Sequence, residues 1–512
     1  VCSSDLNATT VGAMADTQIA ALSAAQVAAL SDTGLAAFNS TQMAAFSTTQ
    51  VGALTRNQLA AMSVTTLGSL EATQTAALSI TQMRALTTTQ LGTLDATDVA
   101  EFSQAQLAAL ASTQVDALTS TNMASLADTQ IAAFTASQIK SISATELAAF
   151  ADTQIAALTA TQVAGLTNTQ VAGLDTTNIT ALNETQIGAL NASQIASLST
   201  SALSAMDAGQ FGALNTTQVR ALTSSQVAAL DATDIGEFTT TQITALTATQ
   251  VTNLTETVVD SLADTQIAAL TTAQLQAITA TNIAGLADTQ IAALAATHIA
   301  ALTTSQVQGL TTTNITAFSE SQIGALTAGQ IALLSAASVS AMADTQVQAL
   351  SNAQVQALTT SQLAGLDETD VGQFTETQIA ALATTQVQAF STTNLSALAD
   401  TQIAALTTTQ LQAVSTSHIA ALTETQVGAL TTTQVAALST SQVRAFNATN
   451  LSALDADQTA ALTATQVAAL TTTQLGNLET TDVGELTTTQ VAALTATQVR
   501  GLTSTTMGAL SE

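Results

Sequence analysis

Large apolar residues recur along the chain with a period of eight. With Asn7 as position 1, the frame runs without insertion to Leu510, so residues 7–510 form 63 octads. Position 8 is Leu, Phe, Met, Ile or Val in every octad, and position 5 is large and apolar except at Thr75 and Thr459. Positions 6 and 7 are mostly Ala, Gly or Ser, and position 4 is Gln in 43 of the 63 octads. This pattern is typical of a tandem repeat whose units share one core.

The polar positions predict one short, capped helix in every octad. Thr159-Ala160-Thr161-Gln162 matches the capping box, in which a hydroxyl and a Gln three residues later each bind the other's main-chain amide. Helices of about two turns are unstable alone and must pack on neighbours. We therefore expect an all-α solenoid, or superhelix, with about three or four helices in each coil. Positions 5 and 8 should face the core, and positions 2 and 6 the solvent.

Three other folds fit the pattern less well. In a β-solenoid, the main alternative, positions 5 and 8 have opposite parity, so a period of two cannot bury both on one face. In one continuous helix, eight residues make about 2.2 turns, and the apolar positions would drift around the axis. A hydrophobic content of 47% disfavours disorder.

A longer repeat of 17 octads lies above the octad. The acidic octad DATDVAEF at 95–102 returns as DATDIGEF at 231–238 and as DETDVGQF at 367–374, and a fourth copy, ETTDVGEL, stands at 479–486. We interpret residues 7–510 as one continuous solenoid with higher-order units at 95–230, 231–366 and 367–478, and partial copies at 7–94 and 479–510. The fourth copy arrives three octads early with the frame intact, which suggests that three octads make about one coil.

Both ends of the sequence depart from the octad. Residues 1–6, VCSSDL, are interpreted as a translated sequencing-adapter scar, the alternative being a genuine irregular N-terminus. Cys2, the only cysteine, belongs to this segment. Residues 511–512 begin a truncated octad, and we expect the chain to be a fragment of a longer protein.

The charge and the apolar runs limit the partners. Six basic and 35 acidic residues give a net charge of −29, which argues against nucleic acids and anionic membranes. A membrane span needs an apolar run of about 18 residues or more. No run in this chain approaches that length, so we expect no membrane insertion.

Nine residues of the acidic octad are the candidate metal ligands. They occupy positions 1, 4 and 7, on one drifting line of a helix, where three carboxylates suit Ca²⁺. They are Asp95, Asp98, Glu101, Asp231, Asp234, Glu237, Glu479, Asp482 and Glu485. The alternative is ordinary helix-start chemistry, in which Asp favours the N-cap and the first turn. In the third copy, Asp367 and Asp370 remain, but Gln373 replaces the Glu. No other cofactor is expected.

No catalytic constellation is found. His298 and His418 both replace the position-4 Gln, where a ring nitrogen can take the place of the capping amide. The sequence has no P-loop, CxxC or HExxH motif, and nothing from which to assemble a Ser-His-Asp triad. We therefore expect no enzymatic activity.

The sequence favours a structural protein: a stalk, a spacer, or a filament subunit that associates with itself head to tail or laterally. The alternative is a binding module that uses one regular face for glycan, Ca²⁺ or ice. A binding face should hold fixed residues in register, whereas the residues at positions 2 and 6 look scattered.

Over nearly its full length, the octad LTxxQ[VI]xAL is similar to low-complexity arrays in very large, secreted, adhesin-like surface proteins of Gram-negative bacteria. Leu222 to Leu230 is one example. The resemblance implies an extracellular, cell-surface location.

Overall fold

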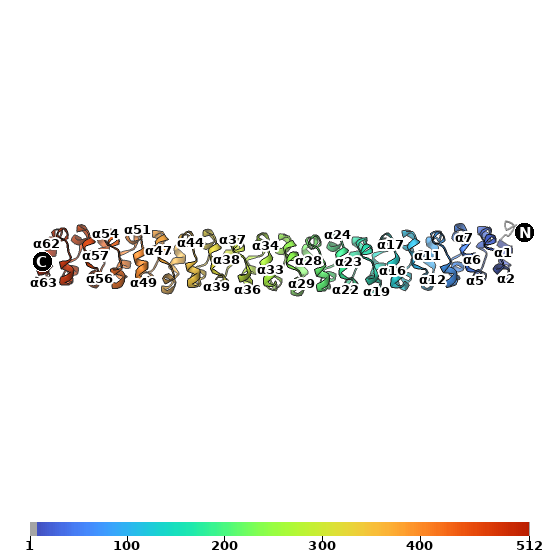
Figure 1. The fold of residues 1–512 in the computed structure, drawn as a ribbon, viewed down its shortest axis with the longest axis horizontal. Coiled ribbons are helices and arrows are strands. Elements are labelled where there is room, and N and C mark those ends of the chain that lie inside the picture. The colour runs from blue at the N-terminus through green and yellow to red at the C-terminus, as the bar shows by residue number, and fades with distance from the viewer. Residues whose placement is uncertain (1–7, 511–512) are drawn as a thin grey trace. The chain divides into compact units, whose positions relative to one another are not determined.

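Each octad forms one short α-helix. The computed structural model describes residues 8–510, which contain 63 helices of four to six residues and no strand, from α1 (Ala8–Gly12) to α63 (Ser504–Ala509) (Figure 1). The predicted all-α solenoid with one helix per octad is confirmed. Residues 1–6, interpreted as an adapter scar, and residues 511–512 lie outside the described part.

The helices begin and end where the capping pattern predicts. In α20 (Ala160–Ala164), the main-chain N–H of Thr159 donates to Gln162 Oε1 at 2.6 Å, and the N–H of Gln162 donates to Thr159 Oγ1 at 3.2 Å. Thr159 and the preceding Leu158 have ψ values of 154° and 133°, outside the helical range. Each helix therefore starts at position 2, and the non-helical positions 8 and 1 lead the chain into the next helix.

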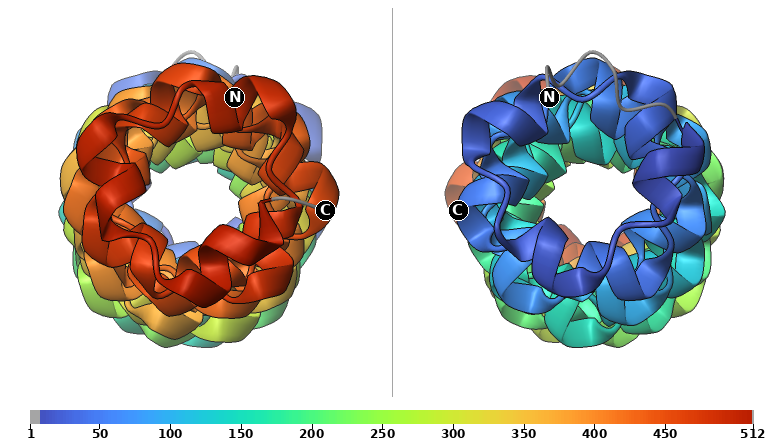
Figure 2. Two further views of the ribbon diagram at one scale, coloured as in Figure 1. Left: turned by 90° about the vertical axis from the view of Figure 1, so that its left-hand side faces the viewer. Right: turned by 90° about the vertical axis from the view of Figure 1, so that its right-hand side faces the viewer.

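The helices stack on partners three and four octads away. α20 packs against α17 (Ala136–Ser141) and α23 (Glu184–Ala189), and the side chain of Gln162 reaches the end of α16 (Asp128–Ala133). One coil therefore holds three to four octads, as predicted. The described residues divide into two compact units, unit 1 up to residue 262 and unit 2 from residue 263, and the same stacking recurs in each. Figure 2 shows the C-terminal helices of unit 2 in one view and the N-terminal helices of unit 1 in the other, each set arranged in a ring.

The core lies inside the coil. Positions 5 and 8 are buried almost throughout, as predicted. In unit 1, the position-8 side chains of five successive octads, from Leu70 to Phe102, line one cavity of about 10 Å³ together with Leu67, Thr75 and Asp98. These five octads span more than one whole coil. Their position-8 side chains can therefore line one cavity only if position 8 points toward the inside of the coil.

Position 4 is also buried, which the sequence did not predict. Gln162 is 2% exposed, and its Nε2 donates to the main-chain carbonyls of Ile131 at 3.0 Å and Phe134 at 2.7 Å. Gln434 makes the same pair of bonds in unit 2, to Ile403 at 3.0 Å and Leu406 at 2.7 Å. The position-4 Gln thus starts its own helix and ties it to the end of a helix in the preceding coil.

Candidate functional site

The two Asp residues of the acidic octad start its helix. In α12 (Ala96–Ala100), Asp95 Oδ1 accepts from the N–H groups of Thr97 at 2.8 Å and Asp98 at 2.9 Å. Asp98 Oδ2 accepts in turn from the N–H of Asp95 at 3.2 Å. The same arrangement recurs in α29 (Ala232–Gly236) and α46 (Glu368–Gly372), and in α60 (Thr480–Gly484) Asp482 Oδ2 accepts from the N–H of Glu479. These hydrogen bonds are the ones expected if the two Asp residues serve to start the helix, the alternative to a metal site.

A position-4 Asp cannot donate to the carbonyls of the preceding coil, and a serine takes over the contact. Ser340 Oγ donates to Asp370 Oδ2 at 2.6 Å, and Ser452 Oγ donates to Asp482 Oδ2 at 2.7 Å. Ser204 makes the equivalent hydrogen bond to Asp234. Each serine stands at position 6 of an octad in the preceding coil. The carboxylate therefore accepts a hydrogen bond where Gln would have donated two.

The position of the serine in the sequence matches its contact with Asp and does not match the 17-octad repeat. The fourth acidic octad is displaced by three octads from the 17-octad period, yet Ser452 still pairs with Asp482. The equivalent places one and two 17-octad units before Ser452 hold Thr316 and Thr180. Duplication of the 17-octad unit alone therefore does not account for the serine.

Glu237 lies near an acidic residue of the preceding coil, Asp207, and the sequence places an acidic residue in the corresponding position for the other two position-7 glutamates. Glu101, Glu237 and Glu485 each have a buried Oε2 without a hydrogen-bond partner. Ser340 and Asp370 are 30 residues apart. The residue 30 positions before each of these glutamates stands at position 1 of its octad and is acidic in all three cases: Glu71, Asp207 and Asp455. In the third copy both acids are absent together, because Gln373 and Ala343 take these places.

Three carboxyl groups of the acidic octads, those of Asp98, Asp234 and Glu237, have a raised pKa. Burial raises the pKa of Glu237, and the negative charges of Asp234, Asp207 and Asp231 raise it further. Burial also raises the pKa of Asp98 and of Asp234, although the hydrogen bond from the main chain of the N-cap Asp acts in the opposite direction.

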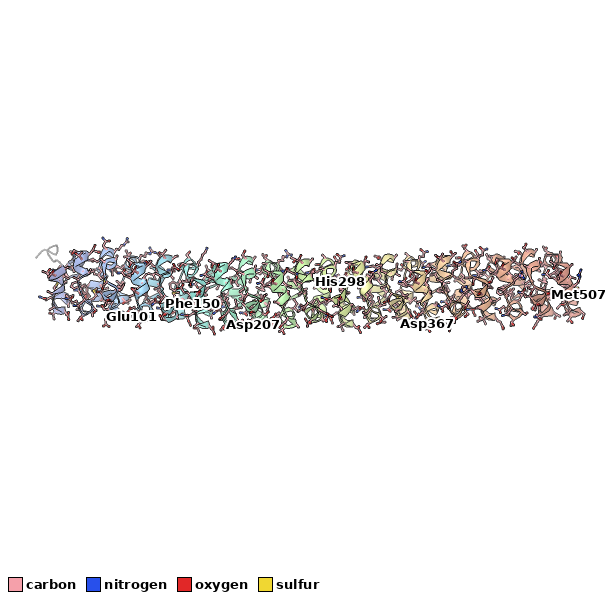
Figure 3. The ribbon with its side chains drawn as sticks, turned by 180° about the vertical axis from the view of Figure 1, so that it is seen from behind. Glu101, Phe150, Asp207, His298, Asp367 and Met507 are labelled. Atoms are coloured by element: carbon pink, nitrogen blue, oxygen red, sulfur yellow. The ribbon has the colours of Figure 1, made fainter. Side chains whose placement is uncertain are left out.

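Six of the nine candidate metal ligands, those at positions 1 and 4, lie at helix starts, whereas Glu101, Glu237 and Glu485 lie at the C-caps of the same helices. Among residues 8–510, no group of three or more His, Cys, Asp or Glu side chains is arranged to hold a metal ion. The assignment of Ca²⁺ to the nine carboxylates stays a sequence-based prediction. Figure 3 labels Glu101 and Asp207 in unit 1 and Asp367 in unit 2.

The two histidines take the role of Gln, as predicted. The N–H of Ala295 donates to His298 Nδ1 at 3.2 Å, and the N–H of Ser415 donates to His418 Nδ1 at 3.3 Å. With Nδ1 accepting, the proton of His418 is on Nε2, which lies 3.0 Å from the carbonyl oxygen of Phe390 in the preceding coil. The imidazole of His418 thus reproduces both the cap and the contact between coils, and that of His298 reproduces the cap.

Octads without Gln at position 4 recur once per coil, a regularity that we missed in the sequence. Apart from His298, they follow one another at intervals of three or four octads. Their position-4 residues are Thr10, Gly34, Thr66, Asp98, Asn122, Glu146, Asn178, Ala202, Asp234, Val258, Asn282, Asn314, Ser338, Asp370, Asn394, His418, Asn450, Asp482 and Thr506. We call these the seam octads.

Most successive seam octads touch one another within each unit. Where they are four octads apart, the link is a side chain, as in the Ser340–Asp370 bond or the 2.6 Å bond from Asn450 Nδ2 to the carbonyl of Leu422. Where they are three apart, the helices pack together, as α12 does with α15 (Ser120–Ser125). The seam octads therefore form one line along each unit.

The seam explains the longer repeat. Each full 17-octad unit contains five seam octads, and the shortened unit 367–478 contains four. The 17-octad repeat is therefore a whole number of coils. The loss of three octads removed one coil and left the seam continuous.

Almost all acidic residues follow the seam. Of the 33 acidic residues in 7–510, 32 lie in seam octads or in the octads directly after them, which we call flanking octads; Asp116 is the exception. All six basic residues lie in the remaining octads. They are Arg56, Arg84, Lys140, Arg220, Arg444 and Arg500. Seam and flanking octads form an acidic face, and the remaining octads form an acid-poor face. The expectation that position-2 residues are scattered is therefore wrong.

The acidic face carries open grooves at corresponding places. In unit 1, a groove of about 800 Å³ is lined by Thr180, Asn183, Glu184 and Asp207, among others. In unit 2, grooves of about 520 and 430 Å³ contain Glu320 and Glu424, respectively. In all three, the lining includes the joint between a seam octad and its flanking octad, with a Glu at position 2. Each groove therefore offers a carboxylate beside hydroxyl and amide groups.

Comparison with known proteins identifies the repeat but no function. The ALTTAQ repeat family matches residues 203–240, 403–440, 436–472 and 475–512. ALTTAQ corresponds to positions 7, 8, 1, 2, 3 and 4 of the octad and stands unchanged at residues 269–274. The predicted octapeptide tandem array is confirmed. No curated protein matches the chain. Within residues 8–510, no helix has the length and apolar character that crossing a membrane requires.

Proposed function

We propose that the chain is a non-enzymatic structural protein, an extracellular stalk, spacer or filament subunit of a bacterial surface structure. The observation that carries this proposal is the glutamine contact between coils. Because the same two hydrogen bonds recur from coil to coil, adding a coil adds length without needing a new kind of contact. The resemblance of the octad to adhesin-like surface arrays supports the extracellular location.

The change in repeat number supports the same function. Residues 367–478 lack one coil of the 17-octad unit, and the octad frame, the seam and the serine–aspartate pair all continue across the change. A protein whose role is to span a distance tolerates such a change. Head-to-tail or lateral association of copies would extend the span further.

The length function is tested with chains that contain one, two and three copies of residues 231–366. Small-angle scattering and electron microscopy should show a maximum dimension that grows in proportion to the number of copies, with constant helicity per residue. A maximum dimension that increases much less than in proportion to the number of copies, as in a compact globule, would contradict the proposal. Antibody labelling of intact and permeabilised cells tests the location, because a surface stalk is labelled on intact cells.

A binding module on the acidic face is the second candidate function. The grooves around Glu184, Glu320 and Glu424 favour it, because they place the same groups in register with the coil. Calorimetry with Ca²⁺ and screening on a glycan array are the tests. Binding that is lost when the three glutamates are replaced by Gln would support a module, and unchanged binding would exclude these grooves.

A further inference from the structure

The junctions between coils are not all alike. In the octads outside the seam, a position-4 Gln donates at least two hydrogen bonds to the main chain of the preceding coil, as Gln434 does to Ile403 at 3.0 Å and Leu406 at 2.7 Å. Asparagine is shorter by one methylene group, and Asn450 Nδ2 donates a single hydrogen bond, to Leu422 at 2.6 Å. Gln434 is 2% exposed and Asn450 is 3% exposed, so the difference lies in the reach of the side chain and not in its burial.

The other seam octads also have weaker ties to the preceding coil. Gly34, Ala202 and Val258 have no side-chain group that can donate a hydrogen bond. Asn394 donates one, to the carbonyl of Leu366 at 2.8 Å. The seam octads therefore join successive coils with fewer hydrogen bonds than the octads beside them. Because one seam octad falls in each coil, these weaker junctions follow one another along one side of the unit.

Like charges lie beside the same junctions, because the seam and flanking octads hold 32 of the 33 acidic residues. In unit 1, Glu184 Oε1 lies 2.6 Å, and Asp207 Oδ1 3.3 Å, from the place that a Cβ on Gly209 would occupy. These two carboxylates come from successive coils and are close neighbours. Burial and the charge of Asp234 raise the pKa of Glu237, and the charge of Asp207 in the preceding coil raises it further. Repulsion therefore acts across the coil junctions on the acidic face.

We propose that each unit opens along its seam. The coils separate there first, because the ties are fewest and the carboxylates repel one another, while the Gln-tied octads of the acid-poor face hold. Opening on one side tilts a coil against the next, so the seam gives each unit a preferred direction of bending. Ions set the extent of opening, because salt screens the repulsion. The inference concerns contacts within each unit, and it goes beyond the stalk or filament role without depending on it.

The strongest ties of the seam stand where its charge is highest. Asp234, Asp370 and Asp482 belong to the acidic octads, and each accepts a hydrogen bond from a serine of the preceding coil. Charge-assisted hydrogen bonds are roughly twice as strong as neutral ones. This additional strength is what we expect if the ties of the seam have to resist repulsion between carboxylates.

Amide hydrogen exchange of the full chain tests the proposal, with α54 (Thr432–Ala437) and α56 (Ala448–Ser452) as an internal pair. These helices carry Gln434 and Asn450 and lie two octads apart in unit 2, so they experience the same solution. At about 0.01 M salt, where the Debye length is about 30 Å, α56 should open at least about five times more often than α54. At about 1 M salt, where the Debye length is about 3 Å, the difference should narrow.

Two variants make opposite changes in side-chain length. Asn450→Gln allows the seam residue to reach the carbonyls of both Ile419 and Leu422, and should bring the opening of α56 close to that of α54. Gln434→Asn makes the reverse change on the acid-poor face and should raise the opening of α54 about five-fold. If Asn450→Gln disturbs the packing, the unmodified chain and Gln434→Asn decide the result.

Equal protection of α54 and α56 in the unmodified chain at both salt concentrations would overturn the proposal. So would a Gln434→Asn variant whose α54 opens no more often than before, because the number of ties would then not matter. A difference between α54 and α56 that stays the same at both salt concentrations would overturn the role of the carboxylates. None of these results would change the proportional growth of length with copy number, so this proposal and the proposed function fail separately.

Discussion

The side-chain amide of Gln162 donates a hydrogen bond at 2.7 Å to the main-chain carbonyl of Phe134 in the preceding coil. The same side chain accepts from the N–H of Thr159 at the start of its own helix. An amide has both a donor and an acceptor, so one residue caps α20 and fastens it to α16. A carboxylate can only accept, which is why Asp234, Asp370 and Asp482 each accept a hydrogen bond from a serine of the preceding coil.

Replacing Gln162 by Glu should weaken the junction between α20 and α16. The acceptor for the Thr159 N–H remains, but the donor is lost and a carboxylate faces the carbonyls of Ile131 and Phe134. The free energy of local opening should fall by about 1–3 kcal/mol. Amide hydrogen exchange in α16 and α20 measures this loss. Gln308→Glu, at an exposed position 6, is the control and should leave exchange unchanged; equal losses in both variants would rule out the role given to position 4.

Ser340→Ala should destabilise the coil that carries Asp370, because a buried carboxylate loses a 2.6 Å charge-assisted hydrogen bond. We expect a loss of about 1–3 kcal/mol in local stability. In an Asp370→Gln background, where the side chain again donates to carbonyls, Ser340→Ala should cost much less. Hydrogen exchange of α46 in this double-mutant cycle gives the coupling. Additive effects would show that the pair is not coupled.

Gly68→Ser should stabilise the first acidic octad. Gly68 occupies the place of the serine, and a Cβ added there would lie 2.9 Å from Asp98 Oδ2, the end of a side chain that can shift. The new hydroxyl would supply the missing donor, and we expect a gain of about 1 kcal/mol in the local stability of α12. Gly68→Ala is the control, because it adds the Cβ without the hydroxyl. Equal exchange rates in the two variants would contradict the donor role.

The acidic octads should make the protein more stable as the solution becomes mildly acidic. The pKa of Glu237 is raised in the folded chain, mainly by burial, so the folded state binds this proton at a higher pH than the unfolded chain does. Stability therefore rises as the pH falls from neutral through the raised pKa, and the gain is complete below the ordinary value of 4.5.

The variant Glu237→Gln tests this pH dependence. It copies the substitution that Gln373 already makes in the third acidic octad. The melting temperature at about pH 7 should rise, and its increase between about pH 7 and pH 5 should shrink. Glu320→Gln removes the same charge from an exposed site and is the control. If both variants show the same pH slope, Glu237 is not responsible.

Thr75→Val should raise stability. Thr75 is one of two exceptions at position 5; it is 5% exposed and lines a small cavity among leucines. Exchanging a hydroxyl for a methyl group at such a place is expected to gain about 1 kcal/mol, and hydrogen exchange in α9 (Ala72–Ala76) measures it. Thr73→Val, at exposed position 3, should gain nothing. A loss of stability at Thr75 would show that its hydroxyl is well accommodated.

The local features of the fold were predictable because their causes lie within one octad. The bonds between Thr159 and Gln162 join positions 1 and 4 of the same octad, and the burial of positions 5 and 8 follows from the large apolar residues that every octad carries there. The contact from Gln162 to Phe134 was not predictable, because the capping role by itself is a sufficient reason for glutamine at position 4, and the sequence gives no sign of a second role. The seam was visible as a spacing of three or four octads, but that spacing has no meaning until the number of octads in a coil is known.

The sequence by itself determined the octad frame, the helix in each octad and the two large residues that each contributes to the core. Only the tertiary structure decided that three to four octads complete a coil, and hence that Asp370 meets Ser340 and that the acidic residues share one face. The reason is physical. A cap is satisfied by neighbours along the chain, whereas the turn from one helix to the next is set at positions 8 and 1 by the packing of whole coils, and no single octad contains that information.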